Sequence, residues 1–133
     1  MSKQVLDRNQ MEHLCELGID TTQATMCWIK QHDDDGTSKD ILCMHDEFCY
    51  EFSSLDPEPA FTLQDIIHKL PKQINGAELV INFCSDYVSY DKVSNRGEVE
   101  VYKCIMGKTC TIDAAYEMLC WCIENGYVRT ESN

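Results

Sequence analysis

Apolar residues recur at helical spacing in three segments of the chain, and this pattern predicts three helices. The segments are residues 8–17, 62–70 and 111–125. The middle one has the clearest pattern, because its leucines and isoleucines fall at positions i, i+3, i+4 and i+7, and Pro71 then ends the helix. A glycine follows each of the other two, Gly18 and Gly126, where it can close a helix in the left-handed conformation.

Two of the predicted helices have polar residues suited to their first turns. Asp7 lies at the start of the first helix, and Gln10 follows three residues later. Thr62 lies at the start of the second helix, and Asp65 follows three residues later. At such positions the first side chain can accept a hydrogen bond from the backbone N–H three residues later, and the later side chain can accept one in return. We expect both helix starts to be stabilised in this way.

Segments rich in β-branched and aromatic residues, separated by turn-forming residues, predict five strands. These are residues 24–31, 40–45, 78–83, 87–91 and 98–105. The first two flank the polar, glycine-containing segment HDDDGTSK and predict a hairpin, and the last three predict a meander. The alternation of Glu98, Val99, Glu100 and Val101 predicts a strand with one face in water and the other covered.

Between the hairpin and the second helix the pattern changes twice. Residues 48–52 alternate aromatic with other residues, which fits either a third short strand or a bulge. Residues 55–60 contain Pro57 and Pro59, and each proline disfavours helix for the residue before it. This second segment is therefore expected to be an extended connector.

These elements together predict an α+β fold, in the order helix, β-hairpin, helix, three-stranded meander, helix. We expect a largely antiparallel sheet with the helices packed on one side. The length of 133 residues and the apolar content of 44 % suit one hydrophobic core, so residues 1–133 are predicted to form a single domain. Trp28 and Trp121 each have aliphatic neighbours and are expected to lie in this core.

The composition predicts a protein that stays in the cytoplasm. No run approaches the roughly 18 apolar residues that a membrane helix needs, and the first residues, MSKQVLDRNQ, contain no apolar segment typical of a signal peptide. The nine cysteines are odd in number and irregular in spacing. We therefore expect reduced thiols, most of them buried, and no disulfide framework.

Negative charge is concentrated in one region of the chain. Residues 31–66 contain ten acidic residues and one basic residue, and so carry −9 of the formal net charge of −12. A field of this kind repels nucleic acid and anionic membranes and favours basic partners. Seven of these acids are the candidate partner-binding residues: Asp33, Asp34, Asp35, Asp40, Glu47, Glu51 and Glu58.

Cys43, His45 and Cys49 are the candidates for a metal site, because thiolate and imidazole are ligands that zinc prefers. Their spacing matches no standard zinc motif, and the chain has no C-x-x-C pair. The alternative is buried thiols beside a surface histidine. On balance we expect neither a metal nor another cofactor.

The sequence has no recognisable catalytic signature. It lacks a P-loop, a dinucleotide-binding glycine motif and an EF-hand loop, and its four histidines and nine cysteines form no local nucleophile motif. We therefore expect a non-enzymatic interaction protein whose acidic region binds a basic protein, as a nucleic-acid mimic or a regulatory factor. The alternatives are a structural or oligomeric accessory protein, which predicts an exposed apolar patch, and a small Cys- or metal-dependent enzyme, which predicts a pocket with Cys or His at its floor.

Three segments carry a resemblance that covers most of the chain: LGID at residues 17–20, AFTLQDIIHKLPKQI at residues 60–74 and AAYEMLCWCIENGY at residues 114–127. In these segments the chain resembles a group of small uncharacterised proteins from phages and other mobile elements of gut bacteria. The resemblance implies no catalytic residue. It implies a context in which proteins that bind and interfere with another protein are common, such as defence or regulatory factors.

Overall fold

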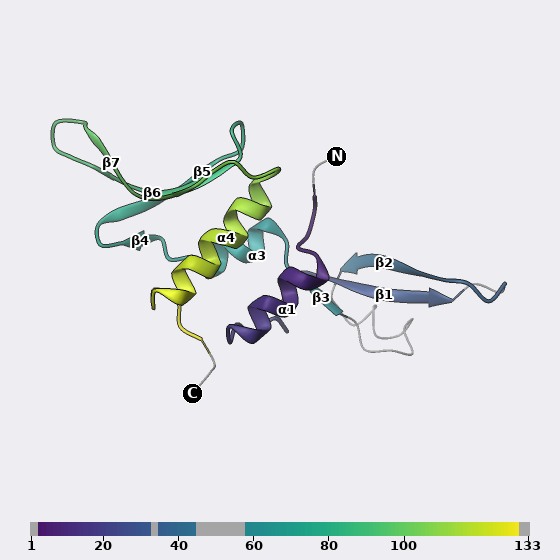
Figure 1. Cartoon of the computed structure of the whole chain (residues 1–133). Helices are drawn as coiled ribbons and strands as arrows, with labels where there is room; N and C mark the ends of the chain where they lie inside the picture. The colour runs from purple at the N-terminus through teal and green to yellow at the C-terminus, as the bar shows by residue number, and fades with distance from the viewer. Residues whose placement is uncertain (1–2, 33–34, 45–57, 131–133) are drawn as a thin grey trace.

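The structure, a computed structural model, describes residues 3–32, 35–44 and 58–130. Within these ranges the chain has the expected α+β class, with three helices and seven strands. The elements, labelled as in Figure 1, are α1 (Arg8–Glu16), β1 (Met26–His32), β2 (Ser38–Met44), β3 (Glu58–Ala60), α3 (Leu63–Lys69), β4 (Gln73–Ile74), β5 (Ala77–Asn82), β6 (Tyr87–Val93), β7 (Val99–Ile105) and α4 (Thr111–Glu124).

The strands are divided between two antiparallel sheets, with the orders β2-β1-β3 and β4-β5-β6-β7. The expectation of antiparallel pairing is confirmed. The pattern of strands in the sequence did not indicate that they would form two separate sheets. The split follows from the position of α3, because the chain enters this helix directly after β3 and begins the second sheet only after it. Figure 1 shows the β1–β2 hairpin extending away from the helices and from the second sheet.

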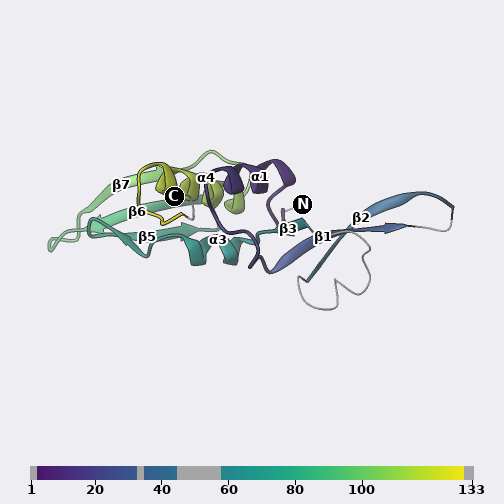
Figure 2. The same ribbon diagram turned by 90° about the horizontal axis from the view of Figure 1, so that it is seen from below.

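The helices cover one side of the four-stranded sheet, as expected. α3 packs against α4, and α4 packs against β6 and β7. Figures 1 and 2 show both helices on the same side of this sheet. The core lies in this layer and contains fully buried side chains from α1, α3, α4 and β6: Leu14, Ile66, Met118, Leu119, Val88 and Tyr90.

Phe61, between β3 and α3, connects the three-stranded sheet to this core. Its side chain is 1 % exposed. Its carbonyl oxygen accepts a hydrogen bond from the N–H of Leu6 at 3.0 Å, and its own N–H lies 3.3 Å from the sulfur of Met11. The short segment before α1 and the first turn of that helix are therefore held against the end of β3.

The two predicted capping arrangements are present. The carboxylate of Asp7 accepts from the N–H of Gln10 at 2.8 Å, and the Gln10 side chain accepts from the N–H of Asp7 at 3.1 Å. Thr62 and Asp65 exchange the same pair of bonds at the start of α3, at 3.2 and 2.9 Å. Each helix start is thus determined by residues within its own first turn.

The strand predictions are correct in position within a few residues, with two additions. The segment expected as an extended connector contributes β3, which pairs with β1 over three residues, and a two-residue strand, β4, forms the edge of the second sheet. The third strand or bulge expected at residues 48–52 lies outside the described residues.

The expectation that β7 has one covered face is wrong for its first half. Val99 and Val101 are 60 % and 56 % exposed, although they alternate with exposed glutamates. Figure 1 shows the reason, since the far end of the β6–β7 hairpin extends beyond the helices that cover the rest of the sheet. No helix within residues 3–32, 35–44 and 58–130 is long and apolar enough to cross a membrane.

Candidate functional site

Three of the seven acidic candidates lie in the described part of the chain. Asp35, Asp40 and Glu58 are all exposed. The other four candidates, Asp33, Asp34, Glu47 and Glu51, lie outside the described residues, as do His45 and Cys49 of the candidate metal site.

Asp40 and Glu58 are brought to one face of the three-stranded sheet. In the register of the sheet, Asp40 of β2 lies opposite position 30 of β1, and Glu58 of β3 lies opposite Trp28. Positions 28 and 30 are two residues apart on one strand and so belong to the same face. The two carboxylates therefore flank this face from the two outer strands.

A single arginine bridges the two carboxylates. Arg8, the first residue of α1, places its Nη2 atom 2.9 Å from Oδ2 of Asp40, and its Nε–H donates to Oε2 of Glu58. The hydrogen bond to Glu58 raises the pKa of Arg8, so this cation stays charged. All three side chains are exposed, by 51 % for Arg8 and by 37 % and 55 % for the two acids. One positive charge is thus shared by two negative charges at the protein surface.

Trp28 lies beside this ion-pair network and lines a depression of about 510 Å³ together with Asp7, Arg8, Asn9 and Asp40. It is half-buried, so the expectation of a core position is wrong for Trp28. Trp121 of α4 is also half-buried but packs against the core cluster. An aromatic ring next to carboxylates is a setting in which guanidinium and ammonium groups bind well, through ion pairs and through the ring face. We call Trp28, Asp40 and Glu58 the acidic sheet face.

Asp35 belongs to the turn at the tip of the hairpin and not to the acidic sheet face. Its carboxylate accepts hydrogen bonds from the hydroxyl and the N–H of Thr37, at 2.6 and 3.0 Å. These bonds stabilise the charged form and lower the pKa of Asp35. The tip therefore carries negative charge at neutral pH, in addition to the charge of the sheet face.

Cys43 is the member of the candidate metal site that lies in the described part of the chain. Cys43 lies opposite Cys27 on the neighbouring strand, with the two sulfur atoms 3.6 Å apart. Among the residues that the structure describes, no three Cys, His, Asp or Glu side chains are grouped as metal ligands would be.

A groove on α4 brings Cys120 and His13 to the same surface, which is the pairing that a Cys-dependent enzyme would need. Burial raises the pKa of the Cys120 thiol, and the nearby charges of Glu124 and Glu117 raise it further. His13 contacts the edge of the Tyr116 ring and approaches Glu16 at 3.9 Å. A thiol that resists ionisation is a weak nucleophile, so this groove does not favour catalysis.

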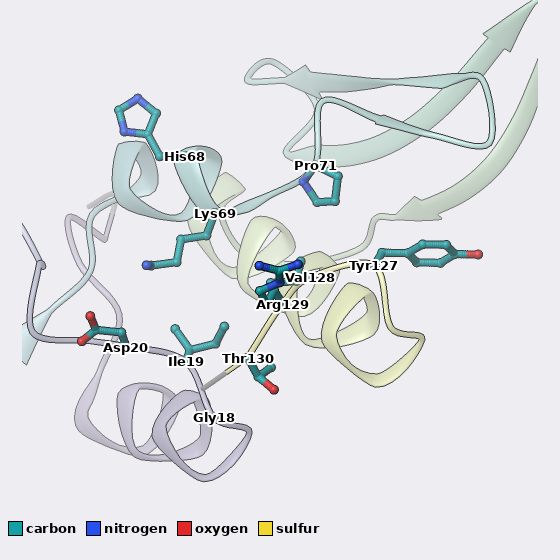
Figure 3. A pocket seen from close by; sticks show the side chains of 10 residues that line it. All are labelled: Gly18, Ile19, Asp20, His68, Lys69, Pro71, Tyr127, Val128, Arg129 and Thr130. Atoms are coloured by element: carbon teal, nitrogen blue, oxygen red, sulfur yellow. The ribbon is translucent and has the colours of Figure 1, made fainter. Parts of the chain in front are cut away.

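The cavity in Figure 3 is one that the sequence pattern did not indicate. It has a volume of about 520 Å³ and is lined by Gly18, Ile19, Asp20, His68, Lys69, Pro71, Tyr127, Val128, Arg129 and Thr130. The lining residues come from three segments of the chain, each at or just after the C-terminal end of a helix: α1, α3 and α4. Glycine or proline marks each helix end in the sequence, but no local signal shows that the three ends meet.

Two of the three basic side chains that line this cavity, Lys69 and His68, have structural partners. Lys69 lies 5.8 Å from the centre of the Phe61 ring, and Figure 3 shows its side chain directed toward Asp20. Figure 3 also shows His68 pointing away from the cavity, and its ring nitrogen lies 2.9 Å from the amide of Gln64. Positive charges near helix C-termini are favourable because the unpaired carbonyls there carry partial negative charge. Of the residues that line the cavity, none is a cysteine, and the histidine among them, His68, points away from it.

Comparison with known proteins returned no match of any kind: no family model, no curated protein and no solved structure matches this chain.

Proposed function

We propose that this protein is a non-enzymatic cytoplasmic interaction protein that binds a basic protein through the acidic region of residues 31–66. The observation that carries the proposal is the convergence of Asp40 and Glu58 on one guanidinium group beside Trp28. The acidic sheet face already binds an arginine of its own chain, and this contact supports binding of a basic side chain from a partner at the same place.

Arg8 is positioned as an internal ligand that a partner can replace. Exposed ion pairs contribute only about 0.2–1 kcal/mol each, so exchanging Arg8 for an arginine or lysine of a partner carries a small penalty. The partner would gain contact with Trp28 and with the surrounding negative charge. The ten acids of residues 31–66 provide long-range attraction, which raises the rate of encounter with a basic surface.

The narrower form of the proposal is nucleic-acid mimicry. In this form the carboxylates occupy phosphate-like positions, and the partner is a protein that binds DNA or RNA. An origin on a phage or mobile element, as the sequence segments suggest, would favour this form, because interference with a host protein is a common role in that context.

Titration with a fluorescent arginine-rich peptide tests the proposal directly. The double variant Asp40→Asn with Glu58→Gln should weaken binding roughly 2-fold to 30-fold, because two exposed ion pairs of about 0.2–1 kcal/mol each are lost. Arg8→Gln should have the opposite effect and strengthen binding, because it frees both carboxylates. Binding by the wild-type protein should weaken as salt is added.

The matched control removes two exposed acids elsewhere, Glu98→Gln with Glu100→Gln on and beside β7. An equal loss of binding in this control would show that net charge alone attracts the peptide, and the proposal would then fail. Pull-down from a cell lysate at low and high salt then identifies the natural partner. Displacement of that partner by added nucleic acid would support mimicry.

A second candidate function is that of an oligomeric accessory protein. Val93 and Val99 are directly opposite in the β6–β7 register, Val101 lies on the same face, and all three are more than half exposed. β7 is also the edge strand of its sheet. Exposed apolar side chains on an edge strand favour association with another strand.

Light scattering over a range of protein concentrations tests this candidate. Val99→Thr with Val101→Thr should weaken self-association about 100-fold, because the two buried valines contribute roughly 1.5 kcal/mol each. Phe83→Ser, at a residue that is 65 % exposed outside this hairpin, should leave the mass unchanged. Added salt should not weaken self-association, in contrast to binding of a basic partner, because it screens the repulsion between acidic copies. A monomeric wild type at every concentration would exclude this function.

A further inference from the structure

The β1–β2 hairpin contains a pair of cysteines in a position suited to disulfide formation. Cys27 and Cys43 are directly opposite each other in the antiparallel register, next to the last pair at the base of the hairpin, Met26 and Met44. Directly opposed residues in antiparallel strands have Cα atoms about 4.5–5.5 Å apart, which is within the range that a disulfide spans. The two sulfur atoms are 3.6 Å apart as thiols. Rotation of the side chains can therefore bring them to the bonding distance of about 2.05 Å without moving the backbone.

The two thiols differ in access to solvent. Cys27 is fully buried, whereas Cys43 is partly exposed. An external oxidant can therefore reach Cys43 first, and Cys27 then stands beside the sulfur that has been modified. This is the arrangement of an attacking and a resolving cysteine.

Cys120 and Cys122 show that closeness in sequence is not sufficient to place two cysteines for disulfide formation. Both lie on α4, but Cys122 is fully buried with its sulfur 4.0 Å from the hydroxyl of Tyr90, whereas Cys120 lines the surface groove with Tyr116. Burial raises the pKa of Cys122 to about 11, which keeps it a thiol at neutral pH. The strand register, and not sequence spacing, selects the reactive pair.

We propose that Cys27 and Cys43 are a reversible redox modification site, which low-molecular-weight disulfides such as oxidised glutathione convert to a cross-strand disulfide. The Cys43 thiolate attacks one sulfur of the oxidant, forms a mixed disulfide and releases one thiol. Cys27 then loses its proton and attacks the Cys43 sulfur, and the second thiol leaves. Two protein thiols lose two electrons, and the oxidant disulfide takes up those electrons and two protons to become two thiols.

The disulfide would join β1 to β2 and hold the register that places Asp40 on the acidic sheet face. Positions 27 and 43 belong to the other face of the sheet, because side chains alternate along each strand. Oxidation therefore leaves Asp40 and Glu58 exposed. This inference does not depend on the proposed function.

Peptide mapping by mass spectrometry after incubation with oxidised glutathione tests the site. In the wild-type protein we expect a cross-linked peptide pair containing Cys27 and Cys43, which disappears on reduction. In Cys27→Ser, glutathione should remain attached to Cys43 at a level about tenfold above that in the wild type, because the resolving thiol is missing. In Cys43→Ser, neither the cross-link nor glutathione at position 27 should form.

Cys84 and Cys15, both exposed, report on the progress of oxidation within the same sample. Glutathione at these two residues without a Cys27–Cys43 cross-link would overturn the proposal. So would a Cys27→Ser variant that shows folded-state circular dichroism but holds no more glutathione at Cys43 than the wild type. Cys84→Ser is the matched control and should form the cross-link at the wild-type level.

Discussion

Replacement of Phe61 with alanine should lower the free energy of unfolding by about 3–5 kcal/mol, the range measured when a large aromatic side chain is removed from a core. Phe61 is 1 % exposed and belongs to the main core cluster. It also lies where the three-stranded sheet joins the helical layer, and its backbone contacts both Leu6 and Met11. Because small domains are stable by only about 5–15 kcal/mol, the loss would leave the protein close to unfolding.

Urea unfolding measures this effect, with Phe83→Ala as the matched control. Phe83 is 65 % exposed, so the same change there should alter stability by less than about 0.5 kcal/mol. A loss below about 1 kcal/mol for Phe61→Ala would contradict the role of this residue as a packed junction. The experiment also tests the prediction of a single domain, since Trp28 reports on the first sheet and Trp121 on α4. Coincident transitions of the two fluorophores are expected for one cooperative unit.

Asp65→Asn should destabilise the protein by about 2 kcal/mol at neutral pH, with a smaller effect in acid. The Asp65 carboxylate accepts three hydrogen bonds: from the N–H and hydroxyl of Thr25, at 3.0 and 2.6 Å, and from the N–H of Thr62 at 2.9 Å. It therefore caps α3 and also ties the residue before β1 to this helix. Asparagine can replace only part of this set, because its amide NH₂ group cannot accept hydrogen bonds.

The pH dependence follows from the direction of the pKa shift. Partial burial of Asp65 opposes its charge, but the hydrogen bonds from Thr25 and Thr62 outweigh burial, so the pKa of Asp65 in the folded protein is lowered. A lowered folded-state pKa means that the stabilisation is complete above the unfolded-state pKa of about 3.9 and is lost as the pH falls through the folded-state pKa. The difference between wild type and Asp65→Asn should therefore shrink below about pH 4.

Unfolding measured at pH 7 and at several acid pH values checks this prediction. Glu100→Gln, which removes an exposed acid on β7, should change stability by less than about 0.5 kcal/mol at every pH. Thr25→Val removes the hydroxyl that donates one of the three hydrogen bonds. It should lower the free energy of unfolding by less than Asp65→Asn does. A difference between wild type and Asp65→Asn that does not vary with pH would show that the carboxylate charge makes no contribution.

Local signals were sufficient for most of the secondary structure. Asp7 and Thr62 cap their helices as predicted, and Gly18 and Gly126 adopt the positive φ values of 95° and 78° that end a helix. These signals are reliable because each depends on hydrogen bonds or backbone conformation within a few residues. Exposure of β7 was predicted less well, because alternation along a strand does not show where the covering helices stop.

The acidic candidates were selected by residue type, and their surroundings were not predicted. Asp40 and Glu58 were selected for their charge alone, whereas Arg8 and Trp28, which complete the site, had no signal that linked them to these acids. Glu58 is separated from Arg8 by 50 positions in the chain. Pairing over such distances depends on how β3 adds to β1 and where α1 then packs.

The sequence by itself determined the fold class, the helix ends, the approximate strands and the location of the negative charge, since each of these depends on neighbouring residues or on composition. Only the tertiary structure decided that there are two sheets, that Arg8 bridges Asp40 and Glu58, and that Cys27 meets Cys43. The physical reason is that strand register and the packing of helix ends result from many long-range contacts acting together. A shift of the β1–β2 register by one residue would turn Cys43 to the face that Asp40 now occupies, and Asp40 to the face that Cys43 now occupies. The local sequence preferences would be the same in both registers.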